Sequence, residues 1–377
     1  MSAPLPESSL ADLLRLHAAT LYIEGLGERL LAAHGSARAV LSASPELLLR
    51  VEGMTRACLE RLLSSESVRL AAEEARRLAP EGVSVLERGG PAYPGALEEL
   101  PGMPLVLEVI GRRDFSTREP CVGLVGSRRP SLYGLRQARR FASELAGRGI
   151  TIVSGLARGI DAEAHTAALD SGGATVAVLG SGLARMYPPG NGPLAARMVL
   201  SEGSAIVSEF PLLAPPLSFH FPMRNRILSG LSDAVLVIEA GERSGSLITA
   251  RHALEQGRGV YALPGRVDSP EAIGCLKLLR DGAAPAIEPD DILPGWTGPA
   301  ARPGDLSGEK PSSRDRIGGP YGARLDSLFA EEDAWHPDRI AEALGEPASL
   351  VLAELGRLEI SGKLVRIEGG RYALARG

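Results

Sequence analysis

Residues 121–161 carry the sequence CVGLVGSRRPSLYGLRQARRFASELAGRGITIVSGLARGID. Two short apolar runs, Cys121–Gly126 and Thr151–Gly155, flank a helical pattern in YGLRQARRFASELAGRG. Neither run alternates polar and apolar residues, and strands of that kind are buried on both faces of a sheet. A strand, a covering helix and a second strand form the repeating unit of a parallel sheet. The stretch therefore predicts an α/β fold.

The same unit recurs along the chain beyond this stretch. Further apolar, β-branched runs are Thr175–Gly180, Ala205–Glu209, Ala234–Glu239 and Val260–Leu263. Helical patterns such as SLITARHALEQGRG lie between most of them, and two β-rich runs, VSVLER and PLVLEVIG, come before residue 121. We therefore predict a doubly wound α/β domain over residues 81–290.

Three other segments surround this domain. Residues 1–80 repeat apolar residues at helical spacing, with glycine turns at residues 23–27 and 51–54, as in helix–hairpin–helix or sterile-alpha-motif-like bundles. Such turns are either plain interhelical turns or offer backbone N–H groups to a phosphate. Residues 291–320 are rich in Pro, Gly and Ser and are predicted to be a flexible linker. Residues 321–377 contain three short helical patterns and an alternating pair of strands, which predicts a winged helix.

Composition excludes several classes of protein. The chain has 377 residues, of which 44% are hydrophobic and 23% charged, as in globular proteins. No run of about 18 apolar residues is present, and the N-terminal residues do not read as a secretory signal, so we expect no membrane span and a cytoplasmic location. The three cysteines, Cys58, Cys121 and Cys275, form no CxxC pair, and we expect neither a zinc site nor another metal or cofactor.

Glycine- and serine-rich turns follow the predicted strands. They are residues 126–131, 154–161, 180–182 and 241–246, and three of the four contain arginine. In a doubly wound sheet such turns meet at the carboxyl edge, where ligands bind, and their N–H groups and helix dipoles favour phosphate. None of them completes a dinucleotide fingerprint, and the chain has no G-x-x-x-x-G-K-[ST] loop, so NAD and P-loop ATP chemistry are not expected.

An aromatic and basic segment, SFHFPMRNR, spans residues 218–226. Only 4% of the chain is aromatic, so two phenylalanines beside Arg-Asn-Arg are conspicuous. Phenyl rings stack on unpaired bases while arginines follow the strand's backbone. Alternatively, both phenylalanines are core residues and an arginine forms an internal ion pair. Of the two rings we favour Phe221 over Phe219 as the stacking residue, because Pro222 stiffens its backbone.

The charge distribution favours the central domain as the anionic ligand's site. Residues 116–270 contain 16 Arg against 12 Asp and Glu, whereas residues 321–377 contain 7 Lys and Arg against 10 Asp and Glu. The acidic balance of the winged helix indicates protein contacts or regulation rather than duplex DNA reading.

Four acidic or histidine side chains need separate interpretation. Asp161 and His165 lie at i and i+4 and could hold a metal or act as an acid–base pair; we expect an N-cap and a structural histidine. Glu209 and Glu239 end strands and could be catalytic acids, but we expect them to bond loop N–H groups or to balance arginines. No nucleophile–histidine–acid set is present as a motif.

Several motifs, in family order, resemble the DNA-processing protein A family (DprA, also called Smf). They are Gly126-Ser-Arg with Tyr133-Gly134, Ser154-Gly-Leu-Ala-Arg-Gly-Ile-Asp161 with Ala164-His165, Phe221-Pro-x-Arg-Asn-Arg226, Leu231-Ser-Asp233, Ser244-Gly-Ser-Leu-Ile-Thr249 and Pro264-Gly265. The resemblance runs from about residue 85 to residue 290 and implies an extended Rossmann-like domain. The N-terminal helices and the winged helix resemble the longer members of the family less specifically.

The resemblance implies a non-enzymatic, sequence-independent binder of single-stranded DNA, a homodimer that loads the RecA recombinase onto incoming strands in natural transformation. The DNA-binding positions that it implies are Gly126, Ser127, Arg128, Gly155, Arg158, Phe221, Arg224, Asn225, Arg226, Ser244, Gly245 and Ser246. Among them Arg128 would grip a phosphate and Phe221 would stack a base. Ser218 stands near the position where many members carry a lysine. The residues that suit a dimer contact are Ile273, Leu276, Leu278 and Leu279.

Two other functions stay open at this point. Glu239 followed by a Gly/Ser loop is similar to the lysine-decarboxylase-like phosphoribohydrolases, which are nucleotide-processing Rossmann enzymes. Their PGGxGTxxE motif is incomplete here, because Pro264-Gly265 lacks the trailing Gly-Thr and Glu. A regulator that reads duplex DNA through the winged helix is the other alternative, and the acidic charge of residues 321–377 argues against it.

Overall fold

The structure is a computed structural model, and it describes residues 7–292, 324–325, 328–329, 334–360, 363–367 and 371–374. It divides into two compact units, Met1–Pro299 and Ala300–Gly377. Apart from residues 291 and 292, the predicted linker over 291–320 lies outside the described residues. Among the described residues no helix is both long and apolar enough to cross a membrane.

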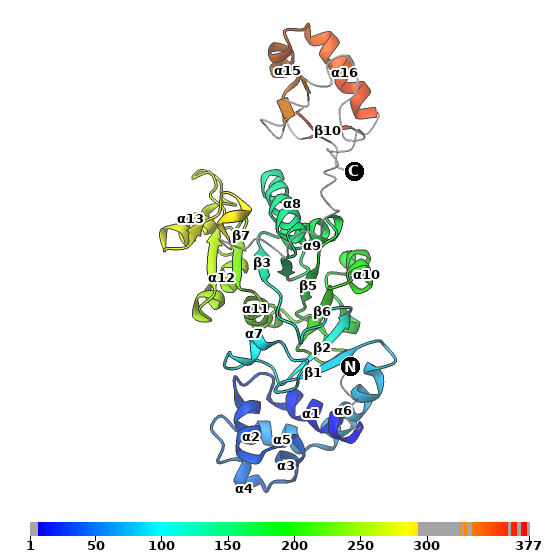
Figure 1. The fold of residues 1–377 in the computed structure, drawn as a ribbon, viewed down its shortest axis with the longest axis vertical. Helices are drawn as coiled ribbons and strands as arrows, with labels where there is room; N and C mark the ends of the chain where they lie inside the picture. Colours follow the sequence, from blue (N-terminus) through cyan, green and yellow to red (C-terminus); the bar gives the residue numbers. More distant parts are fainter. Residues whose placement is uncertain are drawn as a thin grey trace, which may run out of the picture. The chain divides into compact units, whose positions relative to one another are not determined.

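The first unit begins with the predicted helices. They are α1 (Glu7–Thr20), α2 (Leu26–His34), α3 (Ala37–Ser42), α4 (Pro45–Leu48), α5 (Arg56–Leu63) and α6 (Ser65–Leu78) (Figure 1). Three begin at a hydroxyl side chain that accepts a backbone N–H in the first turn, namely Ser36, Thr55 and Ser64. Such caps satisfy N–H groups that the helix itself cannot, which is why the short helices start where they do.

The two glycine turns of this segment are tied together by one side chain. Gly25 and Gly53 have φ values of 67° and 86°, a left-handed conformation that favours glycine. Arg29 donates to the carbonyl oxygens of Glu24 at 3.1 Å and Glu52 at 2.9 Å, so its guanidinium group fills the space between the turns. This bridge and the acidic side chains of Glu24 and Glu28 favour interhelical turns over a phosphate site.

A nine-stranded sheet follows. Its strands are β1 (Ser84–Glu87), β2 (Val106–Gly111), β3 (Cys121–Val125), β4 (Thr151–Ser154), β5 (Thr175–Val178), β6 (Ala205–Ser208), β7 (Ala234–Val237), β8 (Gly259–Ala262) and β9 (Ala284–Pro285). Their order across the sheet is β1-β2-β6-β5-β4-β3-β7-β8-β9. Every neighbouring pair in the run β6-β5-β4-β3-β7-β8-β9 is parallel. Strands β1 and β2 add an antiparallel edge beside β6. The predicted doubly wound sheet is confirmed.

Helices cover both faces of this sheet. They are α7 (Gly95–Glu98), α8 (Leu132–Gly147), α9 (Ile160–Asp170), α10 (Gly192–Leu200), α11 (His220–Gly230), α12 (Ser246–Glu255) and α13 (Ile273–Arg280), with single 3₁₀ turns η1 (Leu183–Arg185), η2 (Pro189–Asn191) and η3 (Pro289–Asp291). Helices α8 and α9 pack with Val122 and Leu124 of β3 in one hydrophobic cluster. Helices α11 and α12 pack with Val125 and with Val235 of β7 in another. Because successive strand residues point to opposite faces, one buried strand serves both clusters.

The direction of winding reverses between β3 and β7. Strands β4, β5 and β6 extend the sheet on one side of β3, whereas β7, β8 and β9 extend it on the other. At such a point the two loops that leave the carboxyl ends of neighbouring strands diverge and leave a crevice, which is where doubly wound sheets bind ligands. The topology therefore puts a site at the ends of β3 and β7.

The N-terminal helices share a core with the sheet. One hydrophobic cluster contains Leu16, Leu26 and Leu30 of the helices together with Val106 of β2 and Ile206 of β6. All five are at most 1% exposed. The predicted boundary at residue 80 thus separates two sequence patterns within one compact unit.

A pair of carboxyl groups lies where α6 meets β2. Glu108 of β2 is 2% exposed, and its carboxyl group lies against that of Glu74 of α6, which accepts the Leu212 N–H at 2.9 Å. Burial first, and then the neighbouring Glu74 and Glu81, raise the pKa of Glu108 far above its ordinary range. The folded protein therefore keeps a proton on this pair that the unfolded chain releases.

The contribution of this pair to stability is expected to fall as pH rises above about 5, because the unfolded chain then releases a proton that the folded protein retains. Glu108→Gln mimics the protonated group and should flatten this dependence. The change that the substitution causes in the free energy of unfolding should be more stabilising at pH 8 than at pH 5 by at least about 1 kcal/mol. Urea unfolding at both pH values measures this. An identical pH dependence in the parent and the variant would show that the pair is ionised.

The second unit contains α15 (Pro337–Leu344), α16 (Ala348–Ile360) and the antiparallel pair β10 (Leu364–Arg366) and β11 (Tyr372–Leu374). Their core includes Trp335, Ile340 and Leu355. Of the first predicted helix, ARLDSLFA, residues 324–325 and 328–329 are described, and they are helical. Two helices followed by a hairpin match the predicted winged helix.

Candidate functional site

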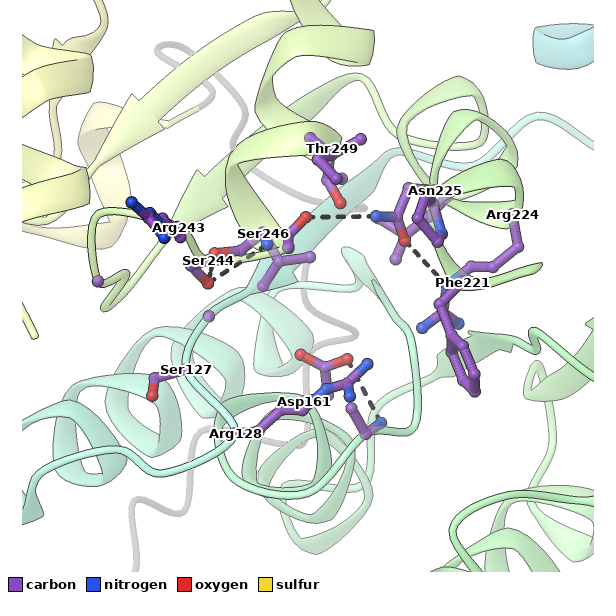
Figure 2. Close-up of a pocket in the computed structure, with 18 of the residues that line it drawn as sticks. Ser127, Arg128, Asp161, Phe221, Arg224, Asn225, Arg243, Ser244, Ser246 and Thr249 are labelled. Atoms are coloured by element: carbon purple, nitrogen blue, oxygen red, sulfur yellow. Dashed lines mark hydrogen bonds between the residues drawn. The ribbon is translucent and has the colours of Figure 1, made fainter. Parts of the chain in front are cut away.

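A cleft of roughly 770 Å³ opens at the carboxyl ends of β3 and β7. Figure 2 shows it lined from three directions, by the loop after β3, by the loop after β7 and by the first turns of α11. Nine of the twelve predicted binding residues line it: Gly126, Ser127, Arg128, Phe221, Arg224, Asn225, Ser244, Gly245 and Ser246. The topology therefore brings together residues that lie more than 100 positions apart in the sequence.

The loop after β3 is held from beneath by Glu239. The carboxylate of Glu239 accepts the Ser131 N–H at 2.9 Å and the Ser131 hydroxyl at 2.5 Å, while Ser131 caps α8 by accepting the Gly134 N–H at 3.0 Å. A side chain at position 134 would collide with this carboxylate, so glycine is required there. The expectation that Glu239 bonds loop N–H groups is confirmed. The loop is thereby fixed, with Arg128 exposed at its surface.

Arg128 and Phe221 are in direct contact. The Arg128 guanidinium carbon lies 5.4 Å from the centre of the Phe221 ring, a cation–π arrangement. Phe221 also packs on the backbone at Gly180, and the ring of Tyr187 meets it edge-on with centroids 5.8 Å apart. Among the described residues Arg128 has no carboxylate within 4 Å, so its charge is available to a ligand.

Arg224 lies beneath the cleft and is only 4% exposed. It donates to the Gly155 carbonyl and to Asn225 Oδ1, both at 3.0 Å. Burial lowers its pKa to about 10, against the attraction of Asp161, and burial likewise raises the pKa of Asp161. A side chain on Gly155 would come within 2.7 Å of the Asp161 carboxylate, so this glycine makes room for the buried charges. Arg224 is thus part of the cleft's floor.

Asp161 is not the N-cap of α9, contrary to expectation. The cap position is Gly159, and Asp161 instead accepts the N–H groups of Gly155 at 3.1 Å and Ala157 at 3.4 Å. This corrects its role: the carboxylate shapes the turn after β4, because that turn doubles back over the helix start. His165 is a satisfied structural histidine, as expected. Its Nε2 accepts the Leu156 N–H at 3.3 Å and its Nδ1 lies 2.6 Å from Thr175 Oγ1, and burial lowers its pKa to about 3.

The loop after β7 forms the opposite wall. The hydroxyls of Ser244 and Ser246 are 2.8 Å apart, and Asn225 Nδ2 donates to the Gly245 carbonyl at 3.3 Å, which ties this loop to α11. Helix α12 begins at Ser246, so the positive end of its dipole faces the cleft. Glu242 of the same loop is paired with Lys277 at 2.6 Å, which offsets its charge.

Three predicted residues do not line the cleft: Gly155, Arg158 and Arg226. Gly155 lies beneath the cleft, where the absence of a side chain leaves room for Arg224 and Asp161. Arg158 is exposed on the neighbouring turn. Arg226 points to another cavity, of roughly 540 Å³, where it is paired with Glu209. The placement of Arg226 in the groove is therefore corrected, and the expectation that Glu209 balances an arginine is confirmed.

Arg243 and Tyr187 belong to the cleft but were not among the predicted binding positions. Arg243 is exposed on the loop after β7 and lines the cleft, and its position inside a Gly/Ser-rich turn was a usable signal. Tyr187 is 43% exposed and extends the aromatic wall begun by Phe221. No local pattern distinguishes Tyr187, because it reaches the cleft only through the path of the chain between β5 and α10.

The predicted dimer residues lie on α13. Ile273, Leu276, Leu278 and Leu279 are all partly buried. Leu278 and Leu279 pack against the cluster under α12, so part of this apolar surface serves the protein's own core. Among the described residues no group of three or more His, Cys, Asp or Glu side chains is placed to hold a metal ion.

Comparison with known proteins gives matches to both units. Residues 84–297 match the family model of DNA recombination-mediator protein A, and residues 325–370 match that of the DprA winged helix domain. Protein Smf of Escherichia coli is 44% identical over 261 residues, which are 68% of each of the two chains.

Two solved structures are also similar. DNA processing protein A of Streptococcus pneumoniae has a TM-score of 0.64 at 29% identity and covers 77% of this chain and 98% of its own. DNA processing protein A of Helicobacter pylori, solved to describe its single-stranded DNA binding mode, has a TM-score of 0.50 at 30% identity. That match covers 55% of this chain and 93% of the other.

Proposed function

The chain belongs to the DNA recombination-mediator protein A family, and on that premise we propose that it binds single-stranded DNA in the cleft between β3 and β7. The observation that carries the proposal is the exposed Arg128 guanidinium resting on the Phe221 ring at the switch point of the sheet. A cation and a phenyl ring side by side match the two parts of an unpaired nucleotide, its phosphate and its base.

Binding exchanges one partner of Phe221 for another. In the free protein the guanidinium group of Arg128 lies over the ring. A base that stacks on this face takes the place of the guanidinium group, which then becomes free to hold a phosphate of the same strand with its planar set of donors. Stacking and phosphate contact therefore form together. Any base has a face that can stack, so this arrangement does not discriminate between sequences.

The charges around the cleft suit a strand whose phosphates face outward. Arg128 and Arg243 are exposed on opposite walls, and Glu242 is occupied by Lys277. Arg224 and Asp161 are buried beneath, where their charges largely offset each other. The exposed cationic groups therefore lie at the rim, where they can contact phosphates. The floor has little net charge and suits the uncharged bases.

The proposal extends to the biological role. The Streptococcus pneumoniae, Bacillus subtilis and Escherichia coli relatives carry the names DNA processing protein DprA or Smf. We propose a DNA-processing role in natural transformation, with a cytoplasmic homodimer that loads RecA recombinase onto single strands. The partly buried leucines of α13 are the proposed dimer contact.

An enzymatic function in nucleotide processing is less well supported by the site. The carboxylate of Glu239 would have to act as the catalytic acid or base, yet it accepts two hydrogen bonds from Ser131 and lies under the loop after β3. Within the described residues, Glu239 does not line the cleft. A carboxylate used in this way serves to position Arg128.

A competition assay between single-stranded and duplex oligonucleotides, with the full chain and over a range of salt concentrations, tests the proposed function. We expect single strands to compete better, and affinity to fall with salt with a logarithmic slope of about 0.7 per phosphate contacted. Tighter binding of the duplex would contradict the proposal and favour the winged helix as the DNA-binding element. Release of free base from a nucleoside monophosphate would favour the enzyme instead.

A further inference from the structure

A second group of aromatic rings adjoins the cleft and has no part in the site described so far. It consists of Tyr22, in the turn after α1, Phe219, which directly precedes α11, and His220, the first residue of α11, with Phe210 beneath. Tyr22 and Phe219 are 47% and 51% exposed, and Phe219 is the most exposed aromatic residue in the described part of the chain. In a protein with 4% aromatic residues, exposed rings in contact with each other call for an explanation.

The rings are held rigidly. Phe210 and His220 stack with centroids 3.9 Å apart, and His220 and Tyr22 are nearly parallel at 12° with centroids 5.9 Å apart. The Tyr22 hydroxyl lies 3.1 Å from His220 Nε2, which fixes the outer ring. Phe210 and His220 are buried, so the row of rings runs from the core to the surface and ends on Tyr22. A ring already ordered in this way loses little conformational freedom when a ligand stacks on it.

Phe219 forms the second side of a corner. Its ring meets Tyr22 at 62° with centroids 5.7 Å apart, and it meets His220 at 74° with centroids 4.6 Å apart. A flat aromatic ligand can stack on one ring and meet the other edge-on, the two arrangements that aromatic pairs favour. Burial lowers the pKa of His220, so the row is uncharged at neutral pH.

The corner lies beside the proposed strand path. Ser218 and Phe221 line the cleft, and Pro222 lines both the cleft and the second cavity, in which Tyr22 and Arg226 lie. Phe219 lies two residues from Phe221 at the start of α11, so at 3.6 residues per turn the two rings point to different sides of the helix, with Pro222 between the two cavities. A strand whose base stacks on Phe221 would pass over Pro222, which lines both cavities, to bring a neighbouring nucleotide to the corner.

The second cavity marks where the strand's phosphates are no longer favoured. Its charged lining residues are Glu24, Glu28, Glu209 and Glu255 on the acidic side against Arg226 and the histidines His17 and His252. Arg226 is already paired with Glu209, and burial lowers the pKa of His17 to about 4, so His17 is neutral. Glu28 is paired with Arg88 at 3.1 Å and Glu255 with Arg251 at 2.9 Å. The one arginine among these lining residues is thus occupied and does not attract a phosphate, whereas an uncharged base needs no such partner.

We propose that Tyr22 and Phe219 form a second base-stacking position, which takes one unpaired base of the strand held in the cleft and contacts no phosphate. The N-terminal segment thereby takes part in DNA binding through Tyr22, in the turn between α1 and α2. The inference rests on the proposed function and extends its footprint by one nucleotide beyond Phe221.

Binding of oligothymidylates of about 4 to 16 nucleotides by the full chain tests the inference. Tyr22→Ala and Phe219→Ala should each weaken binding of the longer oligonucleotides at least about fivefold, the lower end of the range for one stacked base. Binding of the shortest oligonucleotide, which fills the cleft alone, should not change. The slope of affinity against salt should also equal that of the parent, because no phosphate contact is lost.

Two matched variants separate stacking from folding. Tyr22→Phe keeps the ring and loses only the hydroxyl contact with His220, so its affinity for longer strands should fall much less than that of Tyr22→Ala. Leu200→Ala removes an apolar side chain that is 67% exposed on α10 and lines neither cavity, and it should have no effect. Thermal unfolding of each variant shows whether the core beneath His220 is intact.

The possible results decide between the two proposals. If the parent binds single strands and both alanine variants match it at every length, the second stacking position is overturned and the proposed function stands. If the variants lose affinity equally for the shortest oligonucleotide, or if the salt slope falls, the rings act by shaping the Phe221 loop or by holding phosphate, and the inference is again overturned. If the parent binds no single strand, both proposals fail.

Discussion

Phe221→Ala and Arg128→Ala are each expected to weaken single-stranded DNA binding by about tenfold or more. Removing the ring loses one stacked base, which contributes about 1–3 kcal/mol. Removing the guanidinium group loses a charge-assisted hydrogen bond of about 1.5–3 kcal/mol. The losses should be independent of sequence, because neither group reads the edge of a base. Fluorescence anisotropy with labelled oligonucleotides of two unrelated sequences measures both effects.

Salt separates the two variants. Arg128→Ala should reduce the logarithmic salt slope by about 0.7, the value for one phosphate on a single strand, whereas Phe221→Ala should leave the slope unchanged. The double variant should lose less than the sum of the single losses, because Arg128 and Phe221 are in contact and exchange partners on binding.

Arg129→Ala is the matched control for this pair. Arg129 is the next residue of the same loop, is also exposed, and does not line the cleft. Its replacement should change affinity by less than about twofold, the effect of a surface substitution outside the site. Equal losses in the Arg128 and Arg129 variants would mean that the loop attracts DNA through its overall charge, and the assignment of Arg128 to a phosphate in the cleft would be wrong.

Arg226→Ala is expected to destabilise the protein by about 3–5 kcal/mol and to leave DNA affinity unchanged. Arg226 pairs with Glu209, whose side chain is fully buried, so the variant leaves a buried carboxylate without its partner. Burial already raises the pKa of Glu209 against the opposing effect of Arg226. Without Arg226 that pKa rises further, so the variant should lose stability increasingly as pH rises above the ordinary range of a glutamic acid. Chemical unfolding at two pH values measures the loss.

Two comparisons make this prediction specific. Arg197→Ala breaks an exposed pair with Asp170 at 2.7 Å and should cost no more than about 1 kcal/mol. Adding Glu209→Gln to Arg226→Ala should restore part of the stability, because the neutral amide needs no counter-charge. A stable Arg226→Ala variant that has lost DNA affinity as strongly as Arg128→Ala would place Arg226 in the binding groove after all.

Most of the fold follows from patterns that are local in the sequence. The strands at Cys121, Thr151, Thr175, Ala205 and Ala234 coincide with apolar runs, because a strand buried on both faces needs apolar residues at consecutive positions. The helical pattern YGLRQARRFASELAGRG, residues 133–149, repeats at the helical period, and α8 spans Leu132–Gly147. Both signals extend over a few residues and need no knowledge of what they pack against.

The candidate site could be predicted only in part. Loops that follow parallel strands must meet at one edge of the sheet, which is why the loops at Arg128 and Ser244 were predicted to lie together and line one cleft. Tyr187 could not be found in this way, because it belongs to a connection that the topology does not constrain. Asp161 was assigned a local cap, yet it serves the preceding turn.

By itself the sequence determined the secondary structure, the doubly wound sheet and the edge at which its loops converge. The tertiary structure decided which of the charged groups remain available there. Arg224 and Arg226 are two residues apart on α11, so at 3.6 residues per turn they point to opposite sides of the helix, one under the cleft and the other toward Glu209. The partners that neutralise Arg226 and Glu242 come from other elements, because a buried or paired charge depends on what packs against it and not on its neighbours in the chain.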